Sequence, residues 1–414
     1  MSQAELDRVS VCPSKCYLSG DGHWRATISR PAYFSLHLVA IDGSPYVEPV
    51  PPRDISCQLV STVNGRTKYV RPRLVTIKAR SQYEFSYTMT HTSPEATLFI
   101  KVNGDDVAGC PCSVALSVPI ALHAINSGPV EVMGDLDSPY AIAVQSDRKR
   151  VVTECDKVCI YDHDGVKEIT IGSKGGSSGQ FNYPHGITVD ATDNMYVADS
   201  GNHRIQKFSK SGEFLASVGQ EGKKTLQFKN PQGVFIDVIT RKIFVADTGN
   251  HRLQVLHNDL SFSHVFGKKG SGPGHFNHPS DVCVSLTSFV YVADTDNNRI
   301  QVLNVDGSFV RLFGHVGSPE RCLDKPLGIA VDCMDTAIVT SSLNHRVFIF
   351  DPHGNILLIL GKRGDFGQLR RSQCRELMCG GGVGEYSVPT GVTIDTGGFV
   401  YVIDRINKRM QMYL

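Results

Sequence analysis

The sequence predicts an all-β protein in which an immunoglobulin-like (filamin-type) β-sandwich is followed by a six-bladed β-propeller. Three observations lead to this prediction. A hairpin motif recurs at a nearly constant interval, six prolines open six similar units, and the first 118 residues lack the repeat but hold short strand-like runs. Repeats of about 40 to 50 residues that contain several short strands are typical of propeller blades.

The composition is almost electrically neutral, with 42 Lys and Arg against 41 Asp and Glu in 414 residues. This balance argues against a protein whose whole surface coats nucleic acid or membrane. We expect no membrane span and no secretory signal, since no apolar run is long enough and no leader follows Met1. The 12 cysteines are scattered without a C-x-x-C pair. We therefore expect reduced thiols, a cytoplasmic location, and no metal or cofactor.

Residues 1–18 form a polar lead, and residues 19–118 give seven short apolar runs separated by turn residues. Seven strands over about a hundred positions are typical of an immunoglobulin-like sandwich. Residues 119–128 then read as a linker. The runs begin at Trp24, Tyr33, Ile55, Arg73, Tyr83, Thr97 and Cys112.

The segment from Tyr83 to Leu116 resembles the closing strands of filamin-type repeats. It has an aromatic-rich strand, a Val102-Asn103-Gly104 turn, and Pro111 in a Gly-x-Pro bend before the last strand. Asn-Gly readily adopts the positive φ angles of a tight hairpin. The resemblance implies a filamin-type domain that acts as a spacer and orients the propeller.

Residues 129–414 contain the repeated hairpin, whose best copy is YVADSGNHRIQKF from Tyr196. Two alternating apolar runs joined by a polar turn predict paired strands. A Gly-rich loop and a Pro-initiated strand precede each hairpin, and a Gly-terminated strand follows it, which gives four strands per unit. The units are marked by Pro139, Pro184, Pro231, Pro279, Pro326 and Pro389.

The last unit ends at Leu414 without its fourth strand, and a matching strand, 129–134, stands before the first proline. We expect 129–134 to complete the C-terminal blade and close the ring, which leaves no exposed sheet edge at the seam.

The turn sequences around Arg204 and Arg252, Asn-His-Arg in both cases, are similar to those of NHL repeats. Five units match well and the first, from Val151, does not. A filamin-type domain followed by an NHL ring resembles the C-terminal half of tripartite-motif NHL proteins. The resemblance implies a non-catalytic module that binds single-stranded RNA or protein substrates of ubiquitination. Relatives usually carry a RING, B-boxes and a coiled coil before these domains, and this sequence shows no pattern of that kind. The resemblance therefore implies the recognition half of such a protein and not its ubiquitin-ligase activity.

The strand order places the Gly-rich loops and the Asn-x-Arg turns on one face of the ring, called the loop face below. It is rich in basic and amide side chains, and we expect it to bind the ligand. Phe181, Phe228 and Phe276 lie nearby as possible base-stacking groups, but packing between blades is the interpretation that we favour for these rings. The candidate ligand-binding residues are His185, His203, Lys223, Lys224, Lys229, Gln232, His251, Lys268, Lys269, His278, Asn298, Lys325, His345, Arg363, Arg370 and Arg371.

The recurring Asp and Arg of each hairpin have a simpler interpretation as structural residues, because Asp orders a turn and Arg pairs with it. These are Asp199, Arg204, Asp247, Arg252, Asp294, Arg299, Arg346, Asp404 and Arg409.

RNA-binding relatives commonly have basic residues just before the blade prolines. Here only His278 and Lys325 of the six such positions can be cationic, which leaves a purely protein-binding scaffold as an alternative. The others are Ser138, Tyr183, Asn230 and Val388.

A metal-dependent lyase or lactonase is a remote alternative, since six-bladed rings also host such enzymes. Their metal sits on the axis, near residues that start the innermost strands. Those positions offer one His and no carboxylate here, a poor metal site. We therefore expect no catalysis and no small-molecule substrate. The positions are Tyr140, His185, Gln232, Ser280, Leu327 and Thr390.

Overall fold

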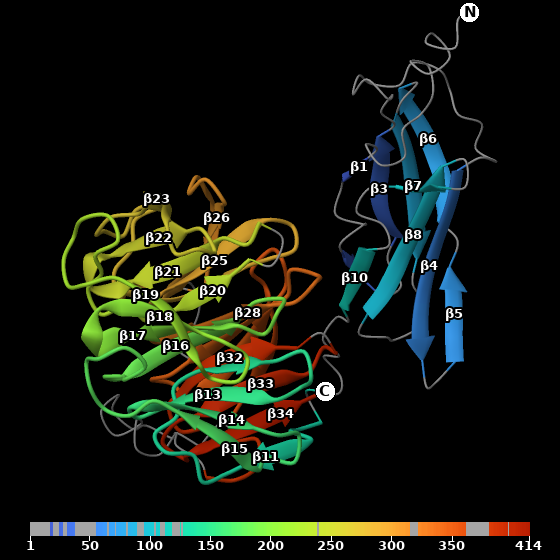
Figure 1. Ribbon diagram of the computed structural model, residues 1–414. Helices are drawn as coiled ribbons and strands as arrows, with labels where there is room; N and C mark the ends of the chain where they lie inside the picture. Colours follow the sequence, from blue (N-terminus) through green and yellow to red (C-terminus); the bar gives the residue numbers. More distant parts are fainter. Residues whose placement is uncertain are drawn as a thin grey trace, which may run out of the picture. The chain divides into compact units, whose positions relative to one another are not determined.

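A computed structural model of the 414-residue chain is shown in Figure 1. It describes residues 127–237, 240–314, 322–361, 381–395 and 397–414. Before these it describes 17–19, 25–27, 31–37, 55–63, 66–70, 72–79, 82–88, 95–102, 105–107, 112–117 and 125. The chain divides into two compact units, the first ending at Pro119 and the second beginning at Ile120. None of the described helices is long and apolar enough to span a membrane.

The first unit contains two sheets. One is antiparallel, in the order β1 (Tyr17–Ser19), β3 (Pro31–His37), β7 (Gln82–Thr88), β6 (Arg73–Ala79). The other runs β2 (Arg25–Thr27), β10 (Cys112–Ser117), β8 (Glu95–Val102), β4 (Ile55–Val63), β5 (Arg66–Val70), and β9 (Asp105–Asp106) also pairs with β8. β10 and β2 are parallel, whereas the other neighbours are antiparallel. The filamin-type assignment stays a prediction.

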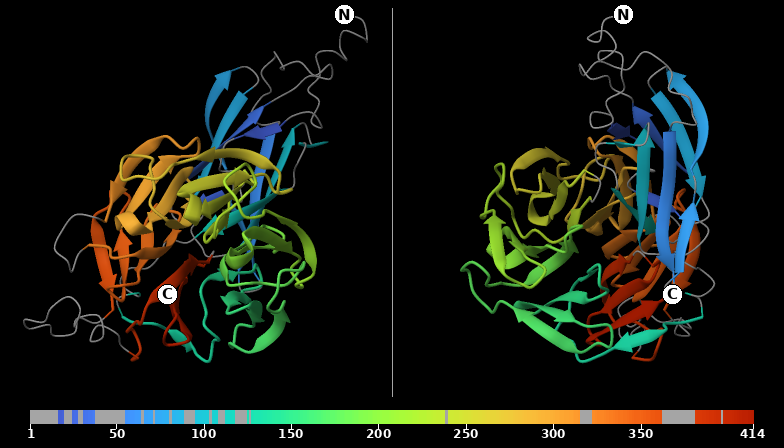
Figure 2. Two further views of the ribbon diagram at one scale, coloured as in Figure 1. Left: turned by 90° about the vertical axis from the view of Figure 1, so that its left-hand side faces the viewer. Right: turned by 45° about the vertical axis from the view of Figure 1, so that its right-hand side comes forward.

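The second unit is a ring of six four-stranded antiparallel sheets, the blades (Figure 2). This confirms the predicted all-β, six-bladed propeller. Blade 1 is β12 (Ile142–Val144), β13 (Arg150–Glu154), β14 (Lys157–Tyr161) and β15 (Lys167–Ile171). Blade 2 is β16 (Pro184–Val189), β17 (Met195–Asp199), β18 (Arg204–Phe208) and β19 (Phe214–Val218). Blade 3 is β20 (Val234–Ile236), β21 (Ile243–Asp247), β22 (Arg252–Leu256) and β23 (Phe262–Phe266).

The remaining blades follow the same order, from the axis outward. Blade 4 is β24 (Pro279–Val284), β25 (Phe289–Asp294), β26 (Arg299–Asn304) and β27 (Phe309–Phe313). Blade 5 is β28 (Pro326–Val331), β29 (Ala337–Ser341), β30 (Arg346–Phe350) and β31 (Ile356–Leu360). Blade 6 is β32 (Pro389–Ile394), β33 (Val400–Asp404), β34 (Arg409–Tyr413) and β11 (Glu131–Met133).

The ring closes through a pairing between segments far apart in the sequence. β11 lies antiparallel to β34, with Val132 opposite Gln411. Just before β11, the Val130 N–H donates to the Met412 carbonyl at 2.8 Å. β11 therefore pairs the edge of β34 that would otherwise be open and gives blade 6 the same four strands as the other blades.

The three loop phenylalanines are part of the core. Phe181, Phe228 and Phe276 are each 0% exposed. Gly172, with φ +77°, lies so close to the Phe181 ring that an added Cβ would stand 2.5 Å from it. This burial agrees with the packing role favoured for these rings from the sequence and leaves none of them exposed for base stacking, because each fills the space between its own blade and the preceding Gly-terminated strand.

Candidate ligand-binding face

An arginine in the hairpin of blade 2 holds the Gly-rich loop against the turn. The Arg204 Nε donates to Asp199 Oδ2 at 2.8 Å, and the guanidinium also donates to the carbonyls of Gly176, Ser177 and Gln180 at 2.8 to 2.9 Å. The Asp199 side chain is fully buried. Charge-assisted bonds of this kind are stronger than neutral ones, so Arg204 orders the loop and is not available to a ligand.

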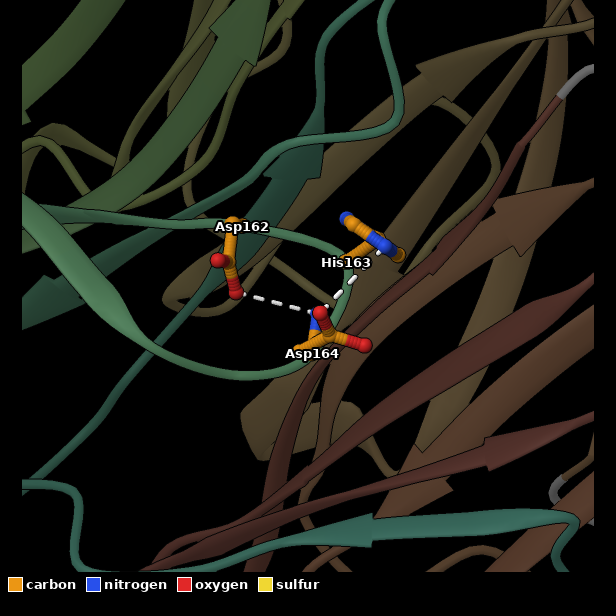
Figure 3. Close-up of side chains that lie close together, drawn as sticks. All are labelled: Asp162, His163 and Asp164. Atoms are coloured by element: carbon orange, nitrogen blue, oxygen red, sulfur yellow. Dashed lines mark hydrogen bonds and ion pairs between the residues drawn. The ribbon is translucent and has the colours of Figure 1, made fainter.

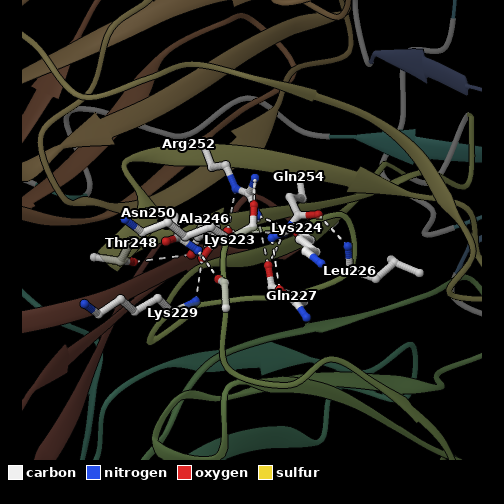
Figure 4. A network of polar contacts seen from close by, with 12 residues as sticks. Lys223, Lys224, Leu226, Gln227, Lys229, Ala246, Thr248, Asn250, Arg252 and Gln254 are labelled. Carbon is white, nitrogen blue, oxygen red and sulfur yellow. Dashed lines mark hydrogen bonds and ion pairs between the residues drawn. The ribbon is translucent and has the colours of Figure 1, made fainter.

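Blades 3, 4 and 6 repeat this arrangement, and Figure 4 shows it in blade 3. Blade 5 departs from it, since Ser341 occupies the position of the aspartate and accepts the Asp324 N–H at 2.8 Å. The Arg Nε to Asp Oδ2 distances are 2.7 Å for Arg252 and Asp247, 2.7 Å for Arg299 and Asp294, and 2.8 Å for Arg409 and Asp404.

A glutamine in each of these blades has a structural role that sequence reasoning missed. The Gln206 Nε2 donates to the Gln180 carbonyl at 2.8 Å and to Asp199 Oδ2 at 3.0 Å, and its Oε1 accepts the Gly179 N–H at 3.0 Å. The side chain is fully buried. The signal was present in the sequence, because a Gln follows the hairpin Arg by two positions again at Gln254, Gln301 and Gln411.

Four of the candidate ligand residues join neighbouring blades. Each ends its hairpin turn with a left-handed backbone, and its side chain accepts the N–H of the residue before the next blade's proline. The pairs are His203 and Asn230 at 3.0 Å, His251 and His278 at 3.0 Å, Asn298 and Lys325 at 2.9 Å, and His345 and Val388 at 3.0 Å. His345 is only 7% exposed, so it is corrected to a structural residue.

The six residues before the blade prolines share an uncommon backbone conformation. Their φ angles lie between +48° and +56°, a region that residues other than glycine rarely adopt. The N–H bonds just described hold four of them there, and Asp156 Oδ1 accepts the Tyr183 N–H at 3.3 Å in the same way. Their side chains are thus presented at equivalent places on the loop face, and Tyr183 is 58% exposed.

The cations expected at two of these positions are neutralised within the protein. The His278 Nδ1 lies 2.7 Å from Asp296 Oδ2, and the Lys325 ammonium pairs with the other oxygen of Asp296. Burial alone raises the pKa of Asp296, but the hydrogen bonds from Lys325 and His278 lower it below its usual range. Neither cation is therefore the unpaired charge that the sequence suggested.

Five lysines on the loop face behave differently. Lys223, Lys224 and Lys229 precede blade 3 (Figure 4), and Lys268 and Lys269 precede blade 4. All five are exposed, and within the described part of the chain none of their ammonium groups forms an ion pair. We call them the lysine cluster.

Two lysines on the opposite face, Lys149 and Lys210, are paired with carboxylates. The Lys149 ammonium lies 2.7 Å from Glu168, and that of Lys210 lies 2.8 Å from Asp193 and 3.0 Å from Asp147. The lysine cluster differs from these two residues in having no carboxylate partner among the described residues.

Two further candidates, His185 and Gln232, belong to a group near the ring axis. The His185 and Tyr140 rings stack with centroids 3.8 Å apart, and the Tyr140 hydroxyl donates to Gln232 Oε1 at 3.4 Å. Burial, aided by the positive charge of Arg405, lowers the pKa of His185 to about 3, so it is neutral near pH 7. His185 and Gln232 are not part of the lysine cluster.

Sequence reasoning also missed Asp281. Its carboxylate accepts the N–H groups of Val282 at 2.9 Å and Ile329 at 3.0 Å, and burial raises its pKa to about 7. Asp281 directly follows Ser280, which is one of the six positions at the start of the innermost strands among which the sequence offers no carboxylate.

A possible metal-binding group is Asp162, His163 and Asp164, after β14 (Figure 3). His163 and Asp164 are exposed, and Asp162 Oδ1 accepts the N–H groups of Asp164 and Val166 at 3.0 and 2.8 Å. These contacts are those of an ordinary aspartate turn. The candidates Arg363, Arg370 and Arg371 lie outside the described residues.

Comparison with known proteins agrees with this geometry. The NHL repeat family matches residues 181–208 and 276–303, which run from the buried loop phenylalanine through the hairpin in blades 2 and 4. Protein brain tumor of Drosophila melanogaster is 42% identical over 65 residues, which are 16% of this chain and 6% of that protein. Human NHL repeat-containing protein 3 is 38% identical over 72 residues, which are 16% of this chain and 20% of that protein.

Among solved structures, a gluconolactonase from Xanthomonas campestris superposes with a TM-score of 0.51 at 15% identity, covering 72% of this chain and 94% of that one. At this identity the likeness concerns the fold alone. The chain thus carries NHL repeats within a six-bladed β-propeller and shares local similarity with NHL-repeat proteins.

Proposed function

We propose that the propeller is a recognition module that binds single-stranded RNA across the lysine cluster. The observation that carries this proposal is the set of five exposed ammonium groups that precede blades 3 and 4 and form no ion pair within the described part of the chain. Basic grooves of this kind track the phosphate backbone of a single strand. Tyr183, exposed on the same face, offers a ring on which one base can stack.

The proposal has a quantitative consequence for salt. For single strands, log K falls by about 0.7 per neutralised phosphate for each tenfold rise in salt. If all five lysines contact phosphates, the slope is about −3.5, and affinity falls about 100-fold between about 50 and 200 mM salt.

The test is selection of a random single-stranded RNA pool on the full chain, followed by affinity measurements on the enriched sequence. Lys223→Glu with Lys268→Glu reverses two charges of the lysine cluster. The matched control, Arg241→Glu with Lys242→Glu, makes the same change in net charge on the turn between β20 and β21, on the opposite face. We expect the first variant to lose binding and the control to retain it.

Failure to enrich any sequence at low salt would contradict RNA binding, and equal loss in both variants would show a nonspecific charge effect. Either result would favour the protein-binding scaffold. Ubiquitination substrates as ligands, a tripartite-motif parent protein and a filamin-type spacer in the first unit are proposals that rest on the sequence resemblance.

A further inference from the structure

The hairpin turn of blade 6 breaks a pattern that the other long turns share. In blades 2 to 5 the first turn residue is a buried Ser or Thr, whose hydroxyl donates to the carbonyl of the proline that opens the next blade. The pairs are Ser200 and Pro231 at 2.7 Å, Thr248 and Pro279 at 2.7 Å, Thr295 and Pro326 at 2.8 Å, and Ser342 and Pro389 at 2.6 Å. In blade 6 the same position is Arg405, and it is exposed.

Aromatic stacking orients Arg405 without neutralising it. The guanidinium carbon lies 5.5 Å from the centre of the Tyr140 ring, and that ring also stacks on His185 with an angle of 3° between the ring planes. A cation–π contact of this kind covers one face of the guanidinium and leaves its N–H edge for another partner. No hydrogen bond or ion pair engages the guanidinium in the described part of the chain.

Among the residues that the structure describes, no carboxylate forms an ion pair with Arg405. The adjacent Asp404 is fully buried and is engaged by Arg409 at 2.8 Å and by the Ser387 N–H at 2.6 Å. His185, behind the Tyr140 ring, is neutral near pH 7. The positive charge is therefore open to an anionic group from outside.

Two large apolar side chains of the same blade are exposed on the loop face. Ile406, the next turn residue, is 60% exposed, and Val383 is 64% exposed. Val383 lies in the loop that Arg409 holds to the turn, by donating to the carbonyls of Gly381 at 2.8 Å and Gly382 at 2.7 Å. Exposed apolar side chains grouped in this way mark interaction surfaces.

We propose that Arg405, Ile406, Val383 and the Tyr140 ring form a docking site, the Arg405 site, for a protein segment that carries a carboxylate next to an aliphatic or aromatic residue. The planar guanidinium matches a carboxylate with two parallel hydrogen bonds. A nucleic acid backbone calls for a row of cations, and the lysine cluster supplies such a row elsewhere on the face. A single oriented cation on a blade that also exposes two apolar side chains fits an acidic, partly apolar peptide better.

The test uses the full chain and short fluorescein-labelled peptides, each with one Glu beside Leu or Phe. Every peptide has a partner in which Gln replaces Glu, and binding is followed by fluorescence anisotropy. We expect a subset of the Glu peptides to bind, with their Gln partners weaker by about tenfold or more. Arg405→Gln should remove this preference, and Arg405→Lys should retain only part of it because the ammonium lacks the planar fork.

A circular dichroism melt checks that these variants fold, and Lys223→Glu with Lys268→Glu serves as a control that should not alter peptide binding. The inference is overturned if no Glu peptide outbinds its Gln partner, or if Arg405→Gln keeps the preference. Displacement of the peptide by an unlabelled oligouridine would show that RNA occupies the site, which would also overturn it. These outcomes are independent of the RNA proposal, which rests on the lysine cluster.

Discussion

Replacing Asp247 with Ala should remove the centre of the polar network in blade 3. The carboxylate is fully buried and accepts the Lys229 N–H and the Arg252 Nε, each at 2.7 Å, the Asn250 amide at 3.0 Å and the Gln254 amide at 3.2 Å. Removing one partner of a buried ion pair costs about 3 to 5 kcal/mol, because the other charge remains.

The cost in stability should lie toward the lower end of this range, because the Arg252 guanidinium keeps its hydrogen bonds to the carbonyls of Lys223, Lys224 and Gln227 at 2.8 to 2.9 Å. We therefore expect Asp247→Ala to cost about 3 kcal/mol, near the lower end of that range. Blade 5 supplies the matched control, since Ser341 stands at the equivalent position. Asp247→Ser can still accept the Lys229 N–H and should cost less than Asp247→Ala.

The assay is differential scanning calorimetry of the full chain, together with hydrogen exchange at the Lys229 amide. A loss of about 3 kcal/mol lowers the Tm of a domain of this size by several degrees, and the Lys229 amide should exchange faster in Asp247→Ala. The reasoning is refuted if Asp247→Ala melts within about a degree of the wild type, or if Asp247→Ser is as damaging as Asp247→Ala.

Four further predictions concern the core, the seam and the group near the axis. Phe228→Ala should cost about 3 to 5 kcal/mol, as a fully buried ring does, whereas Phe228→Leu should cost clearly less by urea denaturation. Val130→Pro removes the N–H that donates to the Met412 carbonyl beside β11 and should cost about 1 to 3 kcal/mol, whereas Val130→Thr, at the same 58% exposed site, should be nearly neutral; equal melting of the two would contradict closure by this segment. Because the pKa of His185 is lowered in the folded protein, this residue takes up its proton at a higher pH in the unfolded chain than in the folded one. Stability should therefore fall as pH drops from 6.5 toward about 3, and His185→Gln should reduce that loss of stability. The pH dependence of stability expected from Asp281 runs in the opposite direction. Because its pKa is raised in the folded protein, stability should fall as pH rises from 3.8 through about 7. Melts of Asp281→Asn should therefore show a gain in stability over the wild type at pH 8 and little change at pH 4.

The architecture could be predicted because its signals are local. Alternating apolar residues around Tyr196 define a hairpin within a dozen positions, and recurrence of that motif defines the blades. Even β11 was foreseeable, because a ring that lacks one strand must obtain it from the other end of the chain. The roles of Asp199 and Arg204 followed from turn chemistry in the same way.

The candidate site was predictable only in part, because its properties depend on neighbours from other blades. Nothing near His203 in sequence shows that its ring accepts the N–H of Asn230, 27 residues away. The charge of Lys325 is cancelled by Asp296, which stands 29 residues earlier and belongs to the previous blade. Phe228 appeared to be a loop residue and is fully buried.

The sequence by itself determined the strand periodicity, the number of blades and the face on which loops and turns gather, since each follows from spacing along one chain. Only the tertiary structure decided which cations on that face remain unpaired. The five lysines of the lysine cluster and Arg405 differ from His278 and Lys325 in the carboxylates that neighbouring blades bring to them. Coulomb energy depends on distance in space and on solvent exposure, and the order of residues along the chain specifies neither.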